Sequence, residues 1–183
     1  MEIIKTEFEG LVVVKPVVFT DNRGYFYETY NTNKYKDLSI TNNFVQDNES
    51  KSSFGTIRGL HSQKGEFAQA KLVRAQQGKV LDVVVDIRKN SKTFGKYFSI
   101  ELSDENKLQL MIPRGFLHGF SVLSETAIFC YKCDNFYNKV SECAVLWNDV
   151  DLNIDWKIDK NKAIVSEKDQ NSMTFKEFIK NMD

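Results

Sequence analysis

Short apolar runs separated by turn-forming residues dominate the chain from about residue 69 onward. Each run holds five to nine residues and is rich in β-branched and aromatic side chains, a pattern typical of strands. Because helical segments do not alternate with these runs, the pattern favours an antiparallel β-sandwich or barrel over a sheet of β/α units. The predicted strands are residues 71–75, 79–87, 96–102, 107–112, 119–123 and 127–133.

Strand 79–87 also indicates where the core lies. Its VLDVVVDI segment is apolar on one face and mixed on the other, which fits a strand in the interior of a sandwich. Helix signals are few. Thr174 and Glu177 have the spacing of a capping box and predict a short helix over about 173–182, and a second short helix is expected around 31–38.

Composition places the chain among globular proteins of one domain, which we expect to span residues 1–183. The 25 basic and 25 acidic side chains cancel, so no overall field favours nucleic acid or a membrane surface. The N-terminal residues 1–10 lack a basic segment followed by a long apolar run, and no apolar stretch approaches the ~20 residues of a membrane span. We therefore expect a cytoplasmic protein with neither a nucleic-acid nor a membrane partner.

The three cysteines do not make a metal site or a disulfide framework. Cys130 and Cys133 form C-Y-K-C, which has the spacing of half a zinc site, but a second half is missing. Residues three apart in a strand also face opposite sides of the sheet. We expect free thiols and no bound metal.

Two histidines occur in the chain, each beside glycines, and each is a candidate for chemistry. His61 lies in GTIRGLHSQ (55–63) and His118 in PRGFLHGF (113–120). A neutral imidazole can remove a proton from a carbon next to a carbonyl at neutral pH, especially where a carboxylate fixes its tautomer. Against this, a lone histidine in a strand is more often a satisfied structural residue.

The enolate that such a base creates needs positive charge or hydrogen-bond donors at its oxygen, and Arg58, Lys71 and His118 could supply them. Inversion of the carbon also needs an acid on the opposite face, for which the hydroxyl of Tyr131 is suitable. Solvated strand positions and ordinary core aromatics explain the same residues equally well. The residues alone therefore leave both interpretations open.

Five motifs together are more specific than any one of them. They are DNRGYFYETY (21–30), VQDNESKSSFGTIRGLHSQ (45–63), QAKLVRAQQGKVLDVVVDIRKNSKTFGK (69–96), IPRGFLHGFSVL (112–123) and WNDVDLNIDW (147–156). In this order they closely resemble the dTDP-4-dehydrorhamnose 3,5-epimerase family, from about residue 2 to about residue 170. The resemblance implies an all-β, cupin-type jelly roll, usually a homodimer, that uses no redox cofactor or metal.

The resemblance also implies a reaction. Members of the family remove and return protons at C3 and C5 of dTDP-4-dehydro-6-deoxy-D-glucose, on either side of the C4 ketone, and give dTDP-4-dehydro-L-rhamnose. A relative that inverts only C3 or C5 of a related nucleotide sugar is the main alternative. A metal-dependent cupin, which usually needs about three histidines, and a binding protein without turnover are more distant alternatives.

By the same resemblance, five residues surround the sugar. His61 is the base, Asp169 of SEKD is its carboxylate partner and Tyr131 is the acid. Lys71 and His118 lie near the developing enolate. The segment around Asp169 matches the family least well.

The resemblance assigns further residues to the dTDP group, with Phe26 and Tyr137 placed against the thymine. Arg23, Phe26 and Glu28 are expected to reach the site of the partner subunit in the dimer. The complete set of expected dTDP contacts is Arg23, Phe26, Glu28, Gln46, Asn48, Arg58 and Tyr137. Two features depart from the family: Ser62 stands where a tyrosine is common, and segment 137–142 lacks a proline.

Overall fold

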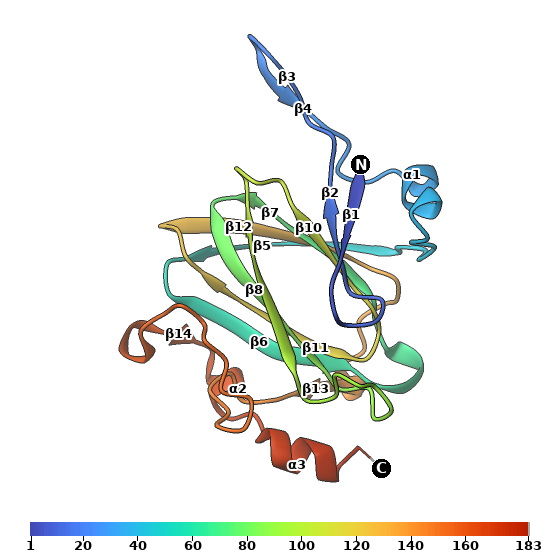
Figure 1. Ribbon diagram of the computed structural model, residues 1–183. Coiled ribbons are helices and arrows are strands. Elements are labelled where there is room, and N and C mark those ends of the chain that lie inside the picture. The colour runs from blue at the N-terminus through green and yellow to red at the C-terminus, as the bar shows by residue number, and fades with distance from the viewer. Residues whose placement is uncertain (183) are drawn as a thin grey trace.

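Two antiparallel sheets face each other in the computed structural model, which describes residues 1–182 (Figure 1). The first sheet has the order β1 (Glu2–Lys5), β2 (Val12–Lys15), β10 (Gln109–Ile112), β7 (Lys71–Gln77), β12 (Thr126–Cys133) and β5 (Gln46–Ser53). The second has the order β13 (Glu142–Ala144), β6 (Thr56–Gln63), β11 (Phe116–Val122), β8 (Lys79–Asp86) and β9 (Tyr97–Ser103), and β14 (Ile164–Val165) runs parallel to β6. The predicted β-sandwich is confirmed.

The six predicted strands correspond to β7 through β12, with ends that differ by at most three residues. The largest difference is in β11, which begins at Phe116 rather than 119, while β7 and β10 each differ by two residues at one end. The strands before residue 69 were not given bounds from the sequence; one of them, β5, carries mainly polar residues. Strand β5 pairs with β12 and β6 pairs with β11, so both contribute polar side chains to the walls of the cavity described below.

The core forms on both faces of the second sheet. Val80 and Val84 of β8 point between the sheets, whereas Leu81, Val83 and Val85 point outward and are also buried. The outer cluster is completed by residues 143–182, which run along this sheet in Figure 1. The apolar residues of β8 are therefore buried on both faces of the strand. The outer cluster includes Trp147, Trp156, Phe175 and Phe178.

Three short helices lie at the periphery. Helix α3 (Phe175–Lys180) begins with the predicted capping box: the Thr174 side chain accepts from Glu177 N–H, and the Glu177 carboxylate accepts from Thr174 N–H. Helix α1 (Thr32–Asp37) confirms the second expected helix. Helix α2 (Glu167–Gln170) was not predicted; Ser166 caps it, and it carries Asp169. Single 3₁₀ turns occur at η1 (Gly65–Phe67), η2 (Lys139–Ser141) and η3 (Lys160–Lys162).

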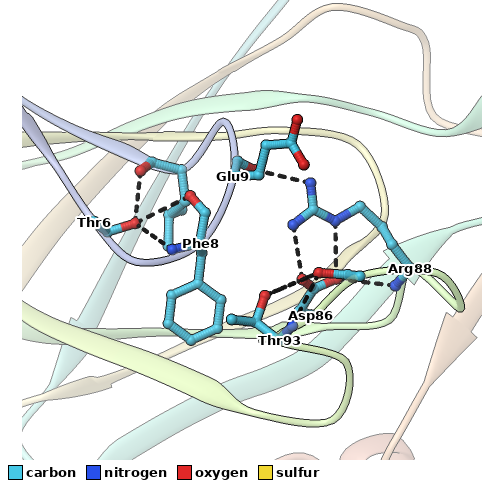
Figure 2. A network of polar contacts seen from close by, with 8 residues as sticks. Thr6, Phe8, Glu9, Asp86, Arg88 and Thr93 are labelled. Atoms are coloured by element: carbon cyan, nitrogen blue, oxygen red, sulfur yellow. Dashed lines mark hydrogen bonds and ion pairs between the residues drawn. The ribbon is translucent and has the colours of Figure 1, made fainter.

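One buried carboxylate fixes the loop between β8 and β9 (Figure 2). Asp86 accepts hydrogen bonds from Arg88 Nε at 2.9 Å and from Thr93 Oγ1 at 2.6 Å, and its side chain is fully buried. Arg88 Nη1 in turn donates to the Glu9 carbonyl at 2.9 Å. The network therefore joins this loop to the N-terminal turn and closes one end of the sandwich.

The hairpin formed by β3 (Phe19–Asp21) and β4 (Gly24–Phe26) projects beyond the sandwich in Figure 1. It exposes large apolar side chains: 64% of Phe19, 58% of Tyr25 and 67% of Phe26 are accessible. Exposure of this much aromatic surface on one projecting element is unusual for an isolated chain and typical of an interaction site.

Candidate active site

A cavity of about 430 Å³ opens between the two sheets. Strands β5, β7 and β12 supply one wall, β6 and β11 supply the other, and β14 with α2 closes the side. Its lining side chains combine charged, aromatic and imidazole groups, the mixture that an enzyme needs to orient a polar substrate. They include Arg58, His61, Lys71, His118, Phe120, Phe129, Tyr131, Lys168 and Asp169.

His61 and Asp169 form a hydrogen-bonded dyad. His61 Nε2 lies 2.6 Å from Asp169 Oδ1, and the other carboxylate oxygen accepts from Gly59 N–H at 3.3 Å. Burial alone would raise the pKa of Asp169. The hydrogen bond from His61, the electrostatic attraction of the His61 ring and the hydrogen bond from Gly59 N–H outweigh burial and lower that pKa. An ionised Asp169 keeps the proton of His61 on Nε2, which leaves Nδ1 as the basic nitrogen.

Strands β6 and β11 approach each other closely beside the dyad. Gly59 has φ +124°, and a Cβ built there would lie 2.6 Å from Gly119 Cα and 2.8 Å from the His118 carbonyl. Only glycine allows both this φ and this approach. The register places His61 directly opposite His118, so the glycines beside the two histidines bring both imidazoles to one cavity.

Lys71 and Tyr131 lie on the opposite wall from His61, on β7 and β12. The Lys71 ammonium is 5.7 Å from the centre of the Tyr131 ring. Burial lowers the pKa of Lys71 and raises that of Tyr131. A flat ligand between the walls would therefore have an imidazole on one face and a protonated phenol on the other.

His118 has a carboxylate partner that the sequence did not reveal as a site residue. His118 Nε2 is 2.9 Å from Asp82 Oδ2, and both side chains are buried. Burial raises the pKa of Asp82 and lowers that of His118, while each opposes the effect of burial on the other. The available signal was a single acid within the apolar run of β8.

Two buried polar atoms among residues 1–182 have no hydrogen-bond partner, and both belong to this region. They are Ser50 Oγ and Asp82 Oδ1; Ser50 lines the cavity, and Asp82 holds His118, which also lines it. Nearly all buried polar groups in folded proteins are hydrogen-bonded, so unsatisfied atoms need an explanation. Their position indicates that the cavity is shaped for a ligand with polar groups.

The side chains expected to bind dTDP divide into two groups. Arg58 lines the cavity, and the inward-facing Gln46 and Asn48 lie on the same face of β5, joined by a hydrogen bond of 3.1 Å. Tyr137 is 54% exposed and donates its backbone N–H to Gln46 Oε1 at 3.1 Å, so it lies beside these two residues. These four positions are consistent with one continuous binding surface next to the dyad.

Arg23, Phe26 and Glu28 are not brought to this cavity by the chain itself. Arg23 and Phe26 belong to the projecting hairpin, where Arg23 pairs with Asp21 at 2.6 Å. Glu28 pairs with Lys34 at the start of α1. Their expected contact with the site of a partner subunit stays a prediction.

Residues 1–182 contain no group of three or more histidine, cysteine and carboxylate side chains placed to hold a metal ion. Cys130, Cys133 and Cys143 are buried free thiols. No helix in the same part of the chain has the length and hydrophobicity that crossing a membrane requires.

Sequence and structure comparisons agree with this geometry. A family model described as dTDP-4-dehydrorhamnose 3,5-epimerase matches residues 5–177. The chain belongs to the dTDP-4-dehydrorhamnose 3,5-epimerase family. The predicted family, its jelly-roll fold and the predicted class of enzyme, an epimerase of dTDP-sugars, are confirmed.

Members of this epimerase family resemble the chain over nearly its whole length. The dTDP-4-dehydrorhamnose 3,5-epimerase of Escherichia coli K12 is 48% identical over 98% of this chain and 97% of its own. The crystal structure of the enzyme from Elizabethkingia anophelis NUHP1 is 60% identical, with a TM-score of 0.92 and 97% of both chains covered. The enzyme from Legionella pneumophila, solved in complex with dTDP-4-keto-L-rhamnose, is 42% identical, with a TM-score of 0.92 over 100% of this chain and 94% of its own.

Proposed function

We propose that the chain converts dTDP-4-dehydro-6-deoxy-D-glucose into dTDP-4-dehydro-L-rhamnose by inverting C3 and C5. The observation that carries the proposal is the His61–Asp169 dyad facing Tyr131 across one cavity, with Lys71 between the sheets. This is the set of groups that deprotonation beside a ketone and reprotonation from the other face require.

The reaction proceeds through an enolate at C4. Nδ1 of His61 takes the proton from C3 or C5, and the Asp169 carboxylate stabilises the imidazolium. The Lys71 ammonium and the His118 imidazole face the oxygen that becomes negative. Tyr131 then gives its hydroxyl proton to the opposite face of the carbon, and exchange with solvent returns both side chains to their starting protonation states.

The nucleotide binds along the inward-facing polar residues of β5, which are Gln46, Asn48, Ser50 and Ser52. Arg58 holds the diphosphate, since a guanidinium presents two parallel donors to phosphate oxygens, while Gln46 and Asn48 bind the nucleoside and Tyr137 packs against the thymine. In a cytoplasmic homodimer, the hairpin of the partner subunit places its Arg23, Phe26 and Glu28 at this site. The exposure of Phe19 and Phe26 supports this arrangement, because dimerisation would cover both.

Proton NMR of the purified protein with the substrate in D₂O tests the proposal. Loss of both the C3 and the C5 proton signals is expected, and loss of only one would replace the double epimerase with the single-position alternative. His61→Asn should abolish exchange but still bind dTDP. Retained exchange in that folded variant would remove His61 from the role of base.

A further inference from the structure

Arg58, a cavity side chain, reaches across the corner where the chain passes from one sheet to the other. Strand β5 ends at Ser53 in the first sheet, and β6 begins at Thr56 in the second. Arg58 Nε donates to Ser52 Oγ at 3.1 Å across this corner. The hydrogen bond therefore connects the two walls of the cavity at the C-terminal end of β5.

The contact holds Arg58 through one particular atom. Among residues 1–182, Arg58 forms no ion pair, and neither Nη1 nor Nη2 has a hydrogen-bond partner. Fixing Nε orients the plane of the guanidinium and leaves both outer nitrogens free for a bidentate contact. A neutral hydroxyl does this without placing a carboxylate beside an incoming anion.

Ser52 is suited to this task by its position. Its side chain is 9% exposed, and it faces inward on the same side of β5 as Gln46 and Asn48. Its hydroxyl accepts from Arg58 and donates to no other group among residues 1–182. Ser53, the next residue, is exposed and lies on the other face of the strand.

We propose that Ser52 is a positioning residue that aims the Arg58 guanidinium at the diphosphate of the substrate. This inference rests on the proposed function, in which Arg58 binds the dTDP group. Arginine side chains have several rotatable bonds, and an exposed one samples many orientations unless a neighbour restrains it. Without Ser52, Arg58 keeps its charge but loses the orientation that a two-point contact needs.

The test compares Ser52→Ala with Ser53→Ala in the full-length protein. Isothermal titration measures the affinity for dTDP and for thymidine, which lacks the phosphates. Ser52→Ala should weaken dTDP binding about tenfold, within the range for one hydrogen bond to a charged group, and leave thymidine binding unchanged. In turnover assays KM should rise about as much while kcat stays within about twofold. Ser53→Ala should bind both ligands as the unmodified protein does.

A double-mutant cycle separates positioning from a merely structural role. Lysine has no Nε–H fork for Ser52 to orient, so Ser52→Ala should change dTDP affinity less than twofold in an Arg58→Lys background. An equal tenfold loss in both backgrounds, or an equal loss for thymidine, would overturn the inference. If the unmodified protein binds dTDP but exchanges no sugar protons, the proposed function fails, while the binding comparison still decides the role of Ser52.

Discussion

Replacement of Asp169 by asparagine removes one charge and retains the shape of the side chain, which makes it a sharp test of the dyad. The two carboxylate oxygens have different partners: Oδ1 accepts from His61 Nε2 at 2.6 Å, and Oδ2 accepts from Gly59 N–H at 3.3 Å. An amide has only one oxygen. Asparagine can therefore satisfy one of these donors but not both.

Each orientation of the amide carries a distinct cost. If its oxygen faces Gly59, its NH₂ group faces His61 Nε2, which must then be unprotonated, and the ring proton moves to Nδ1, the nitrogen that should act as the base. If its oxygen faces His61, the NH₂ group meets the Gly59 N–H, and a buried donor stays unsatisfied at a cost of about 1–3 kcal/mol. Because Asp169 is 3% exposed, water cannot relieve this conflict.

We therefore expect Asp169→Asn to lower kcat by about 10²–10⁴-fold, the contribution of a general base in its correct tautomer. The midpoint of thermal unfolding should fall by only a few degrees, since each kcal/mol shifts it by about 2–4 °C in a domain of this size. Affinity for dTDP should change little, because the nucleotide contacts lie on other residues.

Solvent-proton exchange at C3 and C5 in D₂O, measured by NMR, gives the rate directly, and Asp151→Asn at an exposed position provides a matched control. The control should exchange at the rate of the unmodified protein. A folded Asp169→Asn variant that binds dTDP and keeps more than about a tenth of the original exchange rate would refute the tautomer argument.

The remaining predictions concern the proposed acid Tyr131, the hydrogen bonds of Asp86 in the loop between β8 and β9, and the close approach of β6 and β11 at Gly119. Tyr131→Phe should allow proton removal by the base but slow completed inversion by about 10²-fold or more, seen as substrate deuteration that outpaces product formation. Asp86 has its pKa lowered to about 2: burial would raise it, but hydrogen bonds from the surrounding arginine, serine and threonine outweigh that effect. Because this folded-state pKa lies below the unfolded value, its contribution is present above about pH 4 and is lost as the pH falls toward about 2. The shift from 3.8 to about 2 corresponds to about 2 kcal/mol; acid titration of stability should show this loss in the unmodified protein and not in Asp86→Asn. Gly119→Ala should reduce both folding yield and activity, because its Cβ would lie 2.7 Å from the Arg58 carbonyl oxygen and 3.1 Å from Trp156 Cη2. A variant with the folding yield and activity of the unmodified protein would contradict this.

Local sequence was sufficient for the six strands between residues 71 and 133, but not for the short strands β13 and β14 that follow them. Strand β8 has a long run of β-branched residues that is buried on both faces, so its apolar composition directly reflects its surroundings. The capping box of Thr174 and Glu177 acts within four residues and needs no distant partner. Strand β5 was missed as an element because its inward-facing positions are polar; one of them, Ser50, lines the cavity.

The candidate site residues were predicted as a set, but their mutual arrangement was not available from the chain. His61 and Asp169 are 108 residues apart, and α2, which presents Asp169, is too short to have a recognisable apolar period. From the sequence, Asp82 was only one residue on the face of β8 that mixes polar and apolar side chains. Its role as the partner of His118 could not be predicted, because His118 comes from the neighbouring strand β11, 36 residues later.

The sequence by itself determined the all-β architecture, the family and the types of reactive group, because strand patterning and motif chemistry are local properties of the chain. The tertiary structure alone decided which nitrogen of His61 is held, that Tyr131 stands on the opposite wall, and that Ser52 restrains Arg58. These features depend on how two sheets meet and on the register of their strands. Contacts of that kind arise from the packing of distant segments, and neither composition nor spacing records them.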